Sequence, residues 1–245
     1  MENLYNKITC YINSFHKTKI RRYIDFNENW RFSDVNDSES SNYDYDESGW
    51  QTIDLPHDYS IKQGFDINAL SGVNGGYVKT GIVWYRKTFD ASGMDGNKLV
   101  KIHFDGVAAN SKVFINGRFL GQYPSPFSPF WYDLAPHLYF DKPNVIAVMC
   151  DTSLQPFSRF YIGTGIYRKV FLAVSDSFHF EPFGVYVRTE KIDNNALINI
   201  DASISADAFT NDRGEYWVPV EYTILFDDAS LHDSRFYIMV PHDAL

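Results

Sequence analysis

The 245-residue sequence predicts an all-β fold, a sandwich or a barrel, in two units. Short runs rich in Val, Ile, Phe, Tyr and Trp follow one another at close spacing, which is typical of antiparallel β proteins. Long stretches with helical periodicity are nearly absent. Aromatic residues make up 17% of the chain, a share that suggests either a sugar-binding surface or a large core.

The composition excludes several classes of protein. The formal net charge is −9, so electrostatic binding of nucleic acid is not expected. No apolar run approaches the roughly 18 residues of a membrane-spanning helix. The two Cys cannot form a disulfide framework. Charged residues make up 22% of the chain beside abundant large apolar ones, which favours a folded core over disorder.

Residues 1–21 are interpreted as an N-terminal tail or edge segment. They carry Lys7, Lys17 and Lys19 but lack the apolar stretch and small-residue cleavage site of a signal peptide. The cytoplasm is therefore the expected location, with the periplasm and secretion left open.

From residue 22 onward the chain is interpreted as strands separated by turns and long loops. Asn116-Gly117 lies between two apolar runs, and this pair strongly indicates a hairpin because both turn positions need φ > 0. The strands expected in this part are residues 82–89, 99–104, 112–115, 118–120, 144–150 and 167–174. Two long irregular stretches, residues 55–79 and 151–164, are rich in Gly, Pro, Ser and Asn. Loops of this length in a compact domain usually carry a function.

A domain boundary is expected near residues 181–184, because a new alternating pattern starts there. Residues 196–204 alternate between apolar and polar side chains with period 2. With residues 185–189, 217–226 and 235–240 this gives about four strands, fewer than the roughly seven of a complete immunoglobulin-type sandwich. The second unit therefore looks incomplete.

No pattern in the sequence by itself assigns a catalytic, metal or cofactor site. The glycine-rich residues 72–76 lack the Lys-Ser/Thr ending of a phosphate loop and are interpreted as a turn. The His residues lack the spacing of a zinc helix, and the His57-Asp58 pair is interpreted as fixing a loop or an interface. Carboxylate pairs suit glycoside hydrolysis, but the 31 acidic residues single out no pair. No catalytic residue, metal or cofactor is expected.

An aromatic cluster beside an arginine is the remaining candidate for binding. Phe157, Phe160 and Tyr161 flank Arg159 in the second long loop, and a second aromatic cluster lies at residues 123–132. Aromatic faces pack against the C–H faces of sugars, and Arg donates directed hydrogen bonds to hydroxyls. For each ring alone, a place in the core or in a domain interface is the simpler interpretation. For Arg159 a functional role and a structural salt bridge are equally supported.

Six segments of the chain occur in an order that identifies a family. They are LPHDYS at residues 55–60, GGY and GIVWYRKTF at residues 75–89, FDGV with NS, V and NG…LG at residues 104–121, DL at residues 133–134, NVIAV at residues 144–148 and SRFYIGTGIYR at residues 158–168. In this order they resemble the N-terminal part of glycoside hydrolase family 2 enzymes. Bacterial β-galactosidases are the most similar branch, and the β-glucuronidase and β-mannosidase branches are less similar.

The resemblance implies an architecture. After the tail, residues 22–182 would form a jelly-roll domain of the sugar-binding (galactose-binding-domain-like) type, and residues 183–245 would be part of an immunoglobulin-like β-sandwich. In this family a (β/α)₈ barrel of about 250 residues follows, and it carries the two catalytic glutamates of a retaining mechanism. The catalytic pair would lie outside this sequence. The chain is therefore expected to be inactive alone and to need the barrel as its partner.

Two residues are carried over as substrate contacts on the strength of the resemblance. The family segment that matches SRFY reaches toward the sugar pocket, so Arg159 would contact a β-galactoside-type substrate. The loop around Asp66 would approach the same pocket. The sequence departs from the family pattern at Val83 and Phe160, which are expected to be packing changes, and at residues 125–127, where the loop conformation would differ.

Three functions remain open from the sequence. The first is the non-catalytic N-terminal portion of a β-galactosidase-like enzyme of carbohydrate metabolism, which contributes scaffold and a pocket loop. The second is a stand-alone lectin-like module, and the third is a purely structural or protein-interaction sandwich. The fold alone does not separate them, but the incomplete second unit favours the first.

Overall fold

The computed structural model describes residues 8–14, 22–94, 99–155, 161–175, 178–192, 195–206, 215–226 and 229–241. Within these ranges the fold is almost entirely β, and its one α-helical segment is the single turn α1 (Tyr59–Lys62). The predicted all-β class is confirmed. The chain divides into two compact units, Arg21–Ser175 and a second unit that joins Met1–Ile20 to Asp176–Leu245.

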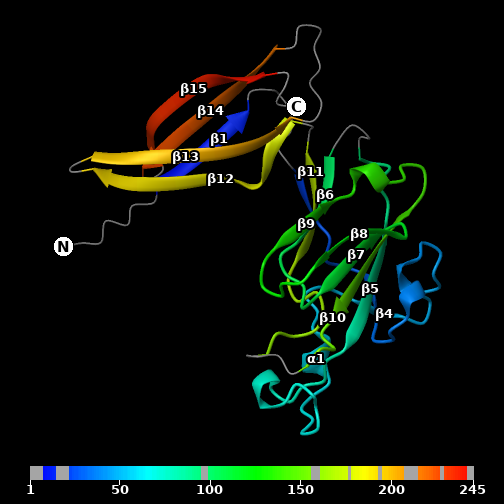
Figure 1. Ribbon diagram of the computed structural model, residues 1–245. Coiled ribbons are helices and arrows are strands. Elements are labelled where there is room, and N and C mark those ends of the chain that lie inside the picture. Colours follow the sequence, from blue (N-terminus) through cyan, green and yellow to red (C-terminus); the bar gives the residue numbers. More distant parts are fainter. Residues whose placement is uncertain are drawn as a thin grey trace. The chain divides into compact units, whose positions relative to one another are not determined.

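Two antiparallel sheets make up the unit Arg21–Ser175 (Figure 1). One contains, in order, β4 (Gln51–Ile53), β3 (Trp30–Ser33), β5 (Ile82–Phe89), β10 (Asn144–Asp151), β7 (Ser111–Ile115) and β8 (Arg118–Tyr123). The other contains β2 (Arg22–Asp25), β11 (Val170–Ser175), β6 (Leu99–Phe104) and β9 (Phe130–Asp133). The strands expected at residues 82–89 and 99–104 are confirmed at the same bounds.

The core of this unit lies between its two sheets, because successive side chains of a strand point to opposite faces. In β6, Val100, Ile102 and Phe104 are fully buried while the residues between them are only half-buried. Strand β5 is buried on both faces over Val83 to Arg86. Its residues Val83 and Tyr85 join the main core, whereas Trp84 joins a smaller cluster on the other face of the sheet.

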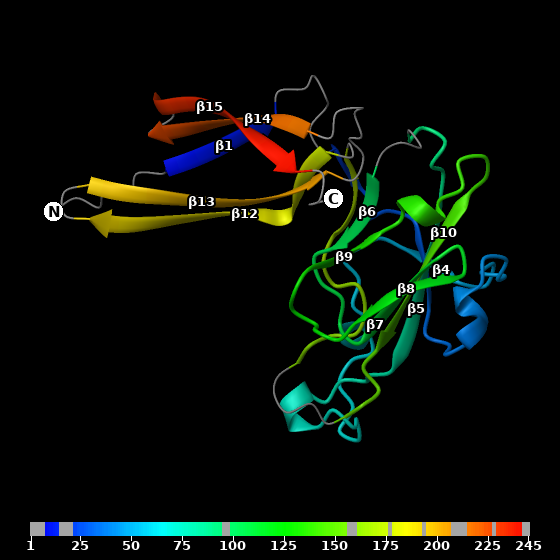
Figure 2. The same cartoon turned by 45° about the horizontal axis from the view of Figure 1, so that its top comes forward.

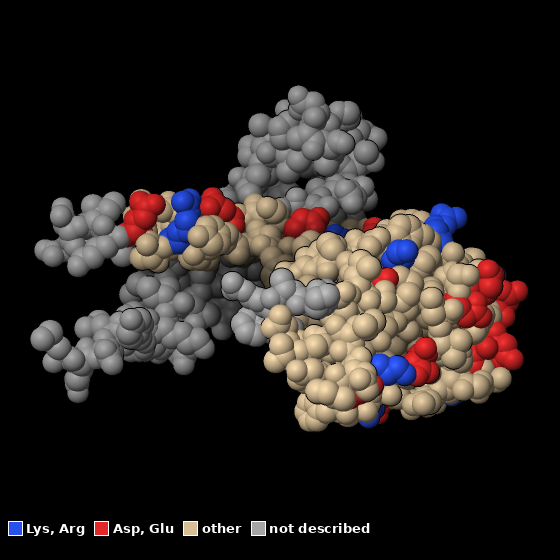
Figure 3. Space-filling view, turned by 60° about the horizontal axis from the view of Figure 1, so that its bottom comes forward, with Lys and Arg blue, Asp and Glu red and all other residues tan. Residues whose placement is uncertain are grey.

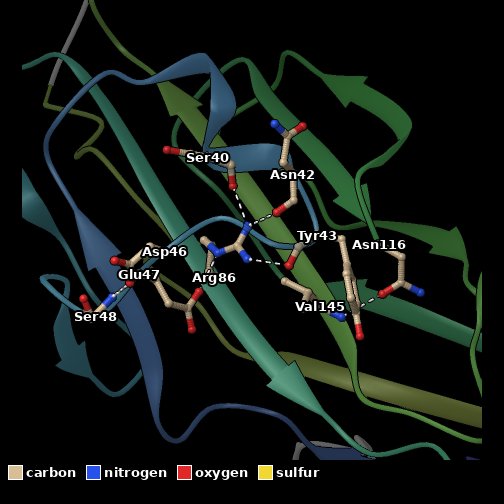
Figure 4. Close-up of polar contacts among 9 residues, drawn as sticks. All are labelled: Ser40, Asn42, Tyr43, Asp46, Glu47, Ser48, Arg86, Asn116 and Val145. Atoms are coloured by element: carbon tan, nitrogen blue, oxygen red, sulfur yellow. Dashed lines mark hydrogen bonds and ion pairs between the residues drawn. The ribbon is translucent and has the colours of Figure 1, made fainter.

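Arg86 holds residues 38–50 against that other face (Figure 4). Its guanidinium donates to the carbonyl oxygens of Ser40 at 2.7 Å, Asn42 at 2.8 Å and Tyr43 at 3.4 Å, and also to the Glu47 carboxylate. The side chain is 1% exposed. A buried charge is tolerated when it is paired and fully hydrogen-bonded. For Arg86, the Glu47 carboxylate supplies the ion pair, and the three carbonyl oxygens accept the remaining hydrogen bonds.

The predicted Asn-Gly hairpin is confirmed between β7 and β8. Asn116 has a φ of 52° and Gly117 a φ of 80°, as a tight turn with both central residues at positive φ requires. The Asn116 side chain also accepts a hydrogen bond from the backbone N–H of Val145 at 2.8 Å (Figure 4). The turn is thereby tied to the neighbouring strand β10.

The second unit contains two sets of paired strands, visible in Figure 2. Strands β1 (Ile8–Ser14), β14 (Glu215–Phe226) and β15 (Ala229–Pro241) form one sheet, and β12 (Phe178–Ile192) pairs with β13 (Asn195–Ala206). Within the segment expected to be a tail or an edge segment, residues 8–14 form an edge strand paired with β14. Strand β12 runs across the boundary expected at residues 181–184, where its pairing with β13 is irregular between Phe180 and Val185. The assignment of residues 183–245 to a partial immunoglobulin-like domain stays a prediction.

In the part of the chain that the structure describes, no helix is long and apolar enough to cross a membrane.

Candidate functional site

The two long loops noted in the sequence meet at one end of the sandwich, the end at which α1 lies (Figure 1). The backbone N–H of His57 donates to the carbonyl oxygen of Ile166 at 2.8 Å, and that of Tyr59 donates to Thr164 at 2.9 Å. These two bonds join the LPHDYS segment to the GTGIYR segment. They form a frame that fixes the end of the second loop.

Asp58 is the central polar residue of this frame. One carboxylate oxygen accepts the backbone N–H of Ser60 at 2.9 Å, which caps α1, and the backbone N–H of Thr164 at 3.1 Å. The other oxygen accepts the phenolic hydrogen of Tyr161. The carboxylate thus has three protein donors, which suits a structural acceptor rather than a free catalytic base.

Gly163 and Gly165 of the GTG sequence allow the backbone to lie close to the side chains of Asp58 and Tyr85. Gly163 has a φ of +76°, and a Cβ atom there would lie 2.8 Å from an Asp58 carboxylate oxygen. Gly165 has a φ of +130°, and a Cβ atom there would lie 2.1 Å from the Tyr85 hydroxyl. L-residues with a side chain rarely adopt such φ values, so both the backbone conformation and the space require glycine.

His57, the residue before Asp58, has a buried imidazole ring that is neutral at pH 7. Its Nδ1 is 2.8 Å from the hydroxyl of the buried Tyr85, and its side chain packs against Phe32. The pKa of His57 is lowered from 6.5 to about 4, mainly by burial and to a smaller extent by the positive charge of Lys62, while the negative charge of Asp58 opposes the shift. The His57-Asp58 pair therefore fixes a loop, which is one of the two alternatives, a loop or an interface, that the sequence left open.

Three hydrogen-bonded hydroxyl groups extend from α1 into the interior of the unit. Ser60 Oγ donates to Thr164 Oγ1 at 2.7 Å, and Thr164 Oγ1 lies 2.6 Å from Thr152 Oγ1. Next to it is a cavity of about 10 Å³, which has room for about one water molecule and none for a sugar ring. Its lining residues come from both long loops and from the residue that follows the first: Ser71, Gly75, Val78, Thr80, Gln155, Tyr161, Ile162 and Gly163.

The structure places one of the two predicted substrate contacts. Asp66 lies on the first loop, is exposed, and accepts the backbone N–H of Asn68 at 2.9 Å. Its own backbone N–H donates to the carbonyl oxygen of Tyr77 at 2.8 Å. Arg159 lies outside the described residues, as does Phe160. The roles of Asp66 and Arg159 in substrate binding stay predictions.

The second aromatic cluster belongs in part to the core. Phe130 is 5% exposed and stacks on Tyr123 with ring centroids 4.4 Å apart and on Phe104 at 5.0 Å. Phe127, by contrast, is 60% exposed. The larger exposed apolar group that sequence reasoning missed lies instead on the first loop, at residues 61–73.

Neither a metal site nor a reactive Cys150 thiol is present among the side chains that the structure describes. Among them, no group of three or more His, Cys, Asp or Glu side chains could hold a metal ion. Cys150 is fully buried, and burial raises the pKa of its thiol far above the usual range, so this thiol is unreactive. The hydrogen bonds around Asp58 form a support for the two loops.

Comparison with known proteins gives matches over most of the chain. A family model described as the second all-β domain of β-galactosidase matches residues 45–155. A β-galactosidase of Bacteroides ovatus is 40% identical over 190 residues, which are 77% of this chain and 22% of that protein. A β-glucuronidase of Formosa agariphila is 32% identical over 209 residues, with 76% of this chain and 21% of that protein covered.

Solved structures show the same relationship. A β-glycosidase from Bacteroides vulgatus has a TM-score of 0.73 and 27% identity, over 89% of this chain and 34% of that one. A β-glucuronidase from glycoside hydrolase family 2 has a TM-score of 0.66 and 26% identity, over 92% of this chain and 26% of that one. The chain thus spans about a fifth of the length of these curated relatives and between a quarter and a third of these solved chains.

Proposed function

Because the chain is homologous to the N-terminal part of family 2 glycoside hydrolases, we propose that it is the non-catalytic N-terminal portion of an enzyme that hydrolyses terminal β-galactosides. The observation that carries this proposal is the 40% identity with a β-galactosidase over 190 residues.

The frame around Asp58 supports a role in presenting a loop to the substrate. Bonds from Tyr161 and Thr164 to Asp58 fix the chain directly after residues 156–160. A guanidinium held on such a support can donate directed hydrogen bonds to sugar hydroxyls. In this proposal Arg159 is that guanidinium, and Asp66 approaches the same substrate from the first loop.

The carboxylate pair that a glycosidase needs is supplied in this proposal by the catalytic part of the enzyme. The purified 245-residue chain is therefore expected to show no turnover of a chromogenic β-galactoside. Measurable turnover that stays with the chain through purification would contradict the proposal.

A chimera tests whether the chain can serve as the N-terminal portion of an active β-galactosidase. The chain replaces the homologous N-terminal part of the Bacteroides ovatus β-galactosidase, and the chimera is assayed with matched β-galactoside and β-glucuronide substrates. We expect β-galactoside turnover, and a fall in kcat/KM of at least about tenfold for Arg159→Ala, since one charged hydrogen bond contributes roughly 1.5–3 kcal/mol. A folded chimera that is inactive on both substrates would contradict the proposal.

A lectin-like module remains the alternative. Titration of the isolated chain with galactose or lactose separates the two functions. We expect weak or no binding, because the proposal assigns most of the pocket to the catalytic part. Sub-millimolar binding that Arg159→Ala abolishes would favour the lectin.

A further inference from the structure

The chain contains two Asn-Gly pairs, Asn74-Gly75 and Asn116-Gly117. An asparagine before glycine is prone to spontaneous deamidation, because glycine has no Cβ atom that would shield its backbone nitrogen from the asparagine side chain. The two pairs have the same intrinsic chemistry. Their surroundings in the fold therefore decide which of them reacts.

Three hydrogen bonds hold the side chain of Asn116. Its amide nitrogen donates to the carbonyl oxygen of His137 at 2.9 Å and to the side-chain oxygen of Asn144 at 2.9 Å. Its oxygen accepts the backbone N–H of Val145 at 2.8 Å (Figure 4). The residue is half-buried in the hairpin between β7 and β8. Deamidation needs this side chain to turn and its nitrogen to leave, so all three bonds must break.

Asn74 has no such restraint. Its side chain is exposed, and it has no hydrogen-bond partner among the residues that the structure describes. The residue is the middle one of η2 (Val73–Gly75), a single 3₁₀ turn whose N-cap, Gly72, makes no side-chain capping bond. Short 3₁₀ turns have poor hydrogen-bond geometry, and exposed segments of loops open locally at low cost in free energy.

One backbone bond opposes the reaction at Asn74. The N–H of Gly75 donates to the carbonyl oxygen of Ser71 at 3.0 Å, and this nitrogen is the atom that must attack. Local opening of η2 breaks that bond, whereas Asn116 must break three side-chain bonds within a paired hairpin. Each bond that must break lowers the population of the reactive conformation, so the structure favours reaction at Asn74.

We propose that Asn74 is a deamidation site of the folded chain and that its isoaspartate product loosens η2. The deprotonated backbone nitrogen of Gly75 attacks Cγ of Asn74, the new N–Cγ bond forms, the Cγ–Nδ2 bond breaks, and ammonia leaves with a proton from water. A second water molecule opens the cyclic succinimide at either carbonyl carbon, which gives aspartate or isoaspartate. The net reaction converts one amide and one water into one carboxylate and one ammonium ion. It does not depend on the proposed function.

The reaction changes the charge of the first long loop. Residues 61–75 contain one cation, Lys62, and one anion, Asp66, so a carboxylate at position 74 changes their formal charge from zero to −1. Figure 3 shows the unit Arg21–Ser175 from the end that carries this loop, and few charged side chains lie on much of that face. Ion exchange is therefore expected to separate the modified chain from the unmodified one.

Isoaspartate also adds a methylene group to the backbone between residues 74 and 75. The packing around Gly75 has no room for it, because Gly75 is buried and a Cβ atom there would lie 2.6 Å from the Cβ atom of Ser71. The bond from the N–H of Tyr77 to the carbonyl oxygen of Gly72, at 2.9 Å, spans the same position. The longer backbone is expected to weaken this bond and that of Gly75.

Peptide mapping by mass spectrometry tests the proposal. The 245-residue chain is incubated at mildly alkaline pH, and deamidation is followed at both Asn-Gly pairs. In the folded chain we expect Asn74 to react at least about tenfold faster than Asn116. In urea we expect the two rates to agree within about threefold, because unfolding removes the difference in surroundings.

Three results would overturn the proposal. The first is equal rates at Asn74 and Asn116 in the folded chain. The second is an intact Asn74 in a folded chain whose two Asn-Gly pairs both react in urea. The third is the same difference in rate in urea as in the folded chain, since the neighbouring sequence and not the fold would then decide which pair reacts.

Asn74→Gln is the matched variant. Gln keeps an exposed amide, but its extra methylene group makes ring closure far slower, so the charge variant seen by ion exchange is expected to disappear. Hydrogen exchange then measures the effect on η2. Exchange at Gly75 and Tyr77 is expected to become faster in the aged chain and to stay unchanged in aged Asn74→Gln. Unchanged exchange in a chain that mass spectrometry shows to carry isoaspartate at position 74 would overturn the loosening of η2.

Discussion

Tyr161 donates its phenolic hydrogen to the carboxylate of Asp58, which lies 103 residues earlier in the chain. Burial raises the pKa of Tyr161, and the hydrogen bond to Asp58 raises it further. The phenol therefore remains a neutral donor over the whole physiological range. With Thr164 bound to the same carboxylate, the end of the second long loop is fixed by one acidic side chain of the first.

Replacement of Asp58 by Ala is expected to lower the free energy of unfolding by about 2–3 kcal/mol, because it removes a helix cap and leaves two further donors without their acceptor. Urea unfolding of the 245-residue chain measures this change. Asp66→Ala is the matched control, since Asp66 is exposed and its side chain caps only Asn68, and it is expected to cost less than about 1 kcal/mol. Equal losses for the two variants would show that the cross-loop bonds contribute nothing.

Gly165→Ala is expected to destabilise the chain by more than about 2 kcal/mol. The new methyl would lie 2.1 Å from the Tyr85 hydroxyl at a φ of +130°, so steric overlap and backbone strain act together. Gly81→Ala is the control, because a Cβ atom at Gly81 has nothing within 4 Å and its φ is not positive. Thermal unfolding compares the pair, and a Gly165→Ala midpoint equal to that of Gly81→Ala would refute the expectation.

The stability of the chain is expected to fall on acidification between about pH 6.5 and pH 4. His57 has a folded pKa of about 4 against an ordinary value of 6.5, so in this window the unfolded state binds the proton and the folded state does not. Stability is complete above pH 6.5 and decreases as the pH falls toward 4, by on the order of 3 kcal/mol in all. Urea midpoints across this range measure the slope. His57→Gln removes the titration and is expected to flatten the profile, and an unchanged slope in that variant would assign the effect to other groups.

The sequence predicted the sandwich because its signals are local. The β-rich run at residues 99–104 and the Asn-Gly turn at residues 116–117 each need only neighbours along the chain, and both are confirmed. The sequence also predicted that His57-Asp58 fixes a loop or an interface, and the structure shows the loop. The partners of this pair, Tyr85 and Tyr161, could not be predicted, because they lie 28 and 103 residues away and pairing across loops leaves no periodic signal.

The exposed apolar group at residues 61–73 could not be predicted for a different reason. A segment such as residues 61–73 mixes apolar and polar residues without a period, so the sequence does not show which side chains face water. The exposure of Phe65 depends on the backbone bonds that turn the loop, and those bonds are tertiary information.

Arg86 was likewise expected only as a residue of a strand. In an ordinary half-buried strand it would face solvent, since an outward position alternates with the buried residues on either side. The segment that covers it, residues 38–50, contains one short helical turn, η1 (Ser38–Ser41), and little regular structure. Nothing in its sequence shows that it folds back over the sheet.

Replacement of Arg86 by Met is expected to lower the free energy of unfolding by about 3 kcal/mol or more. A buried ion pair can be exchanged for apolar residues without loss when both partners are replaced. Here most of the partners are backbone carbonyl oxygens, those of Ser40, Asn42 and Tyr43, which no side-chain substitution removes. Met fills similar space but leaves these acceptors unpaired.

Arg86→Lys separates charge from geometry, because one ammonium group cannot reach both the carbonyls of Ser40 and Tyr43 and the Glu47 carboxylate in the way that the guanidinium fork does. We expect Lys to recover less than half of the loss, with hydrogen exchange becoming faster across residues 38–50 in both variants while β6 stays protected. Arg118→Met, at an exposed arginine whose guanidinium lies 3.3 Å from His137, is the control and is expected to cost under about 0.5 kcal/mol. Full recovery by Lys would mean that the positive charge alone holds the segment, and unchanged exchange at residues 38–50 would mean that the smaller cluster around Trp84 holds it instead.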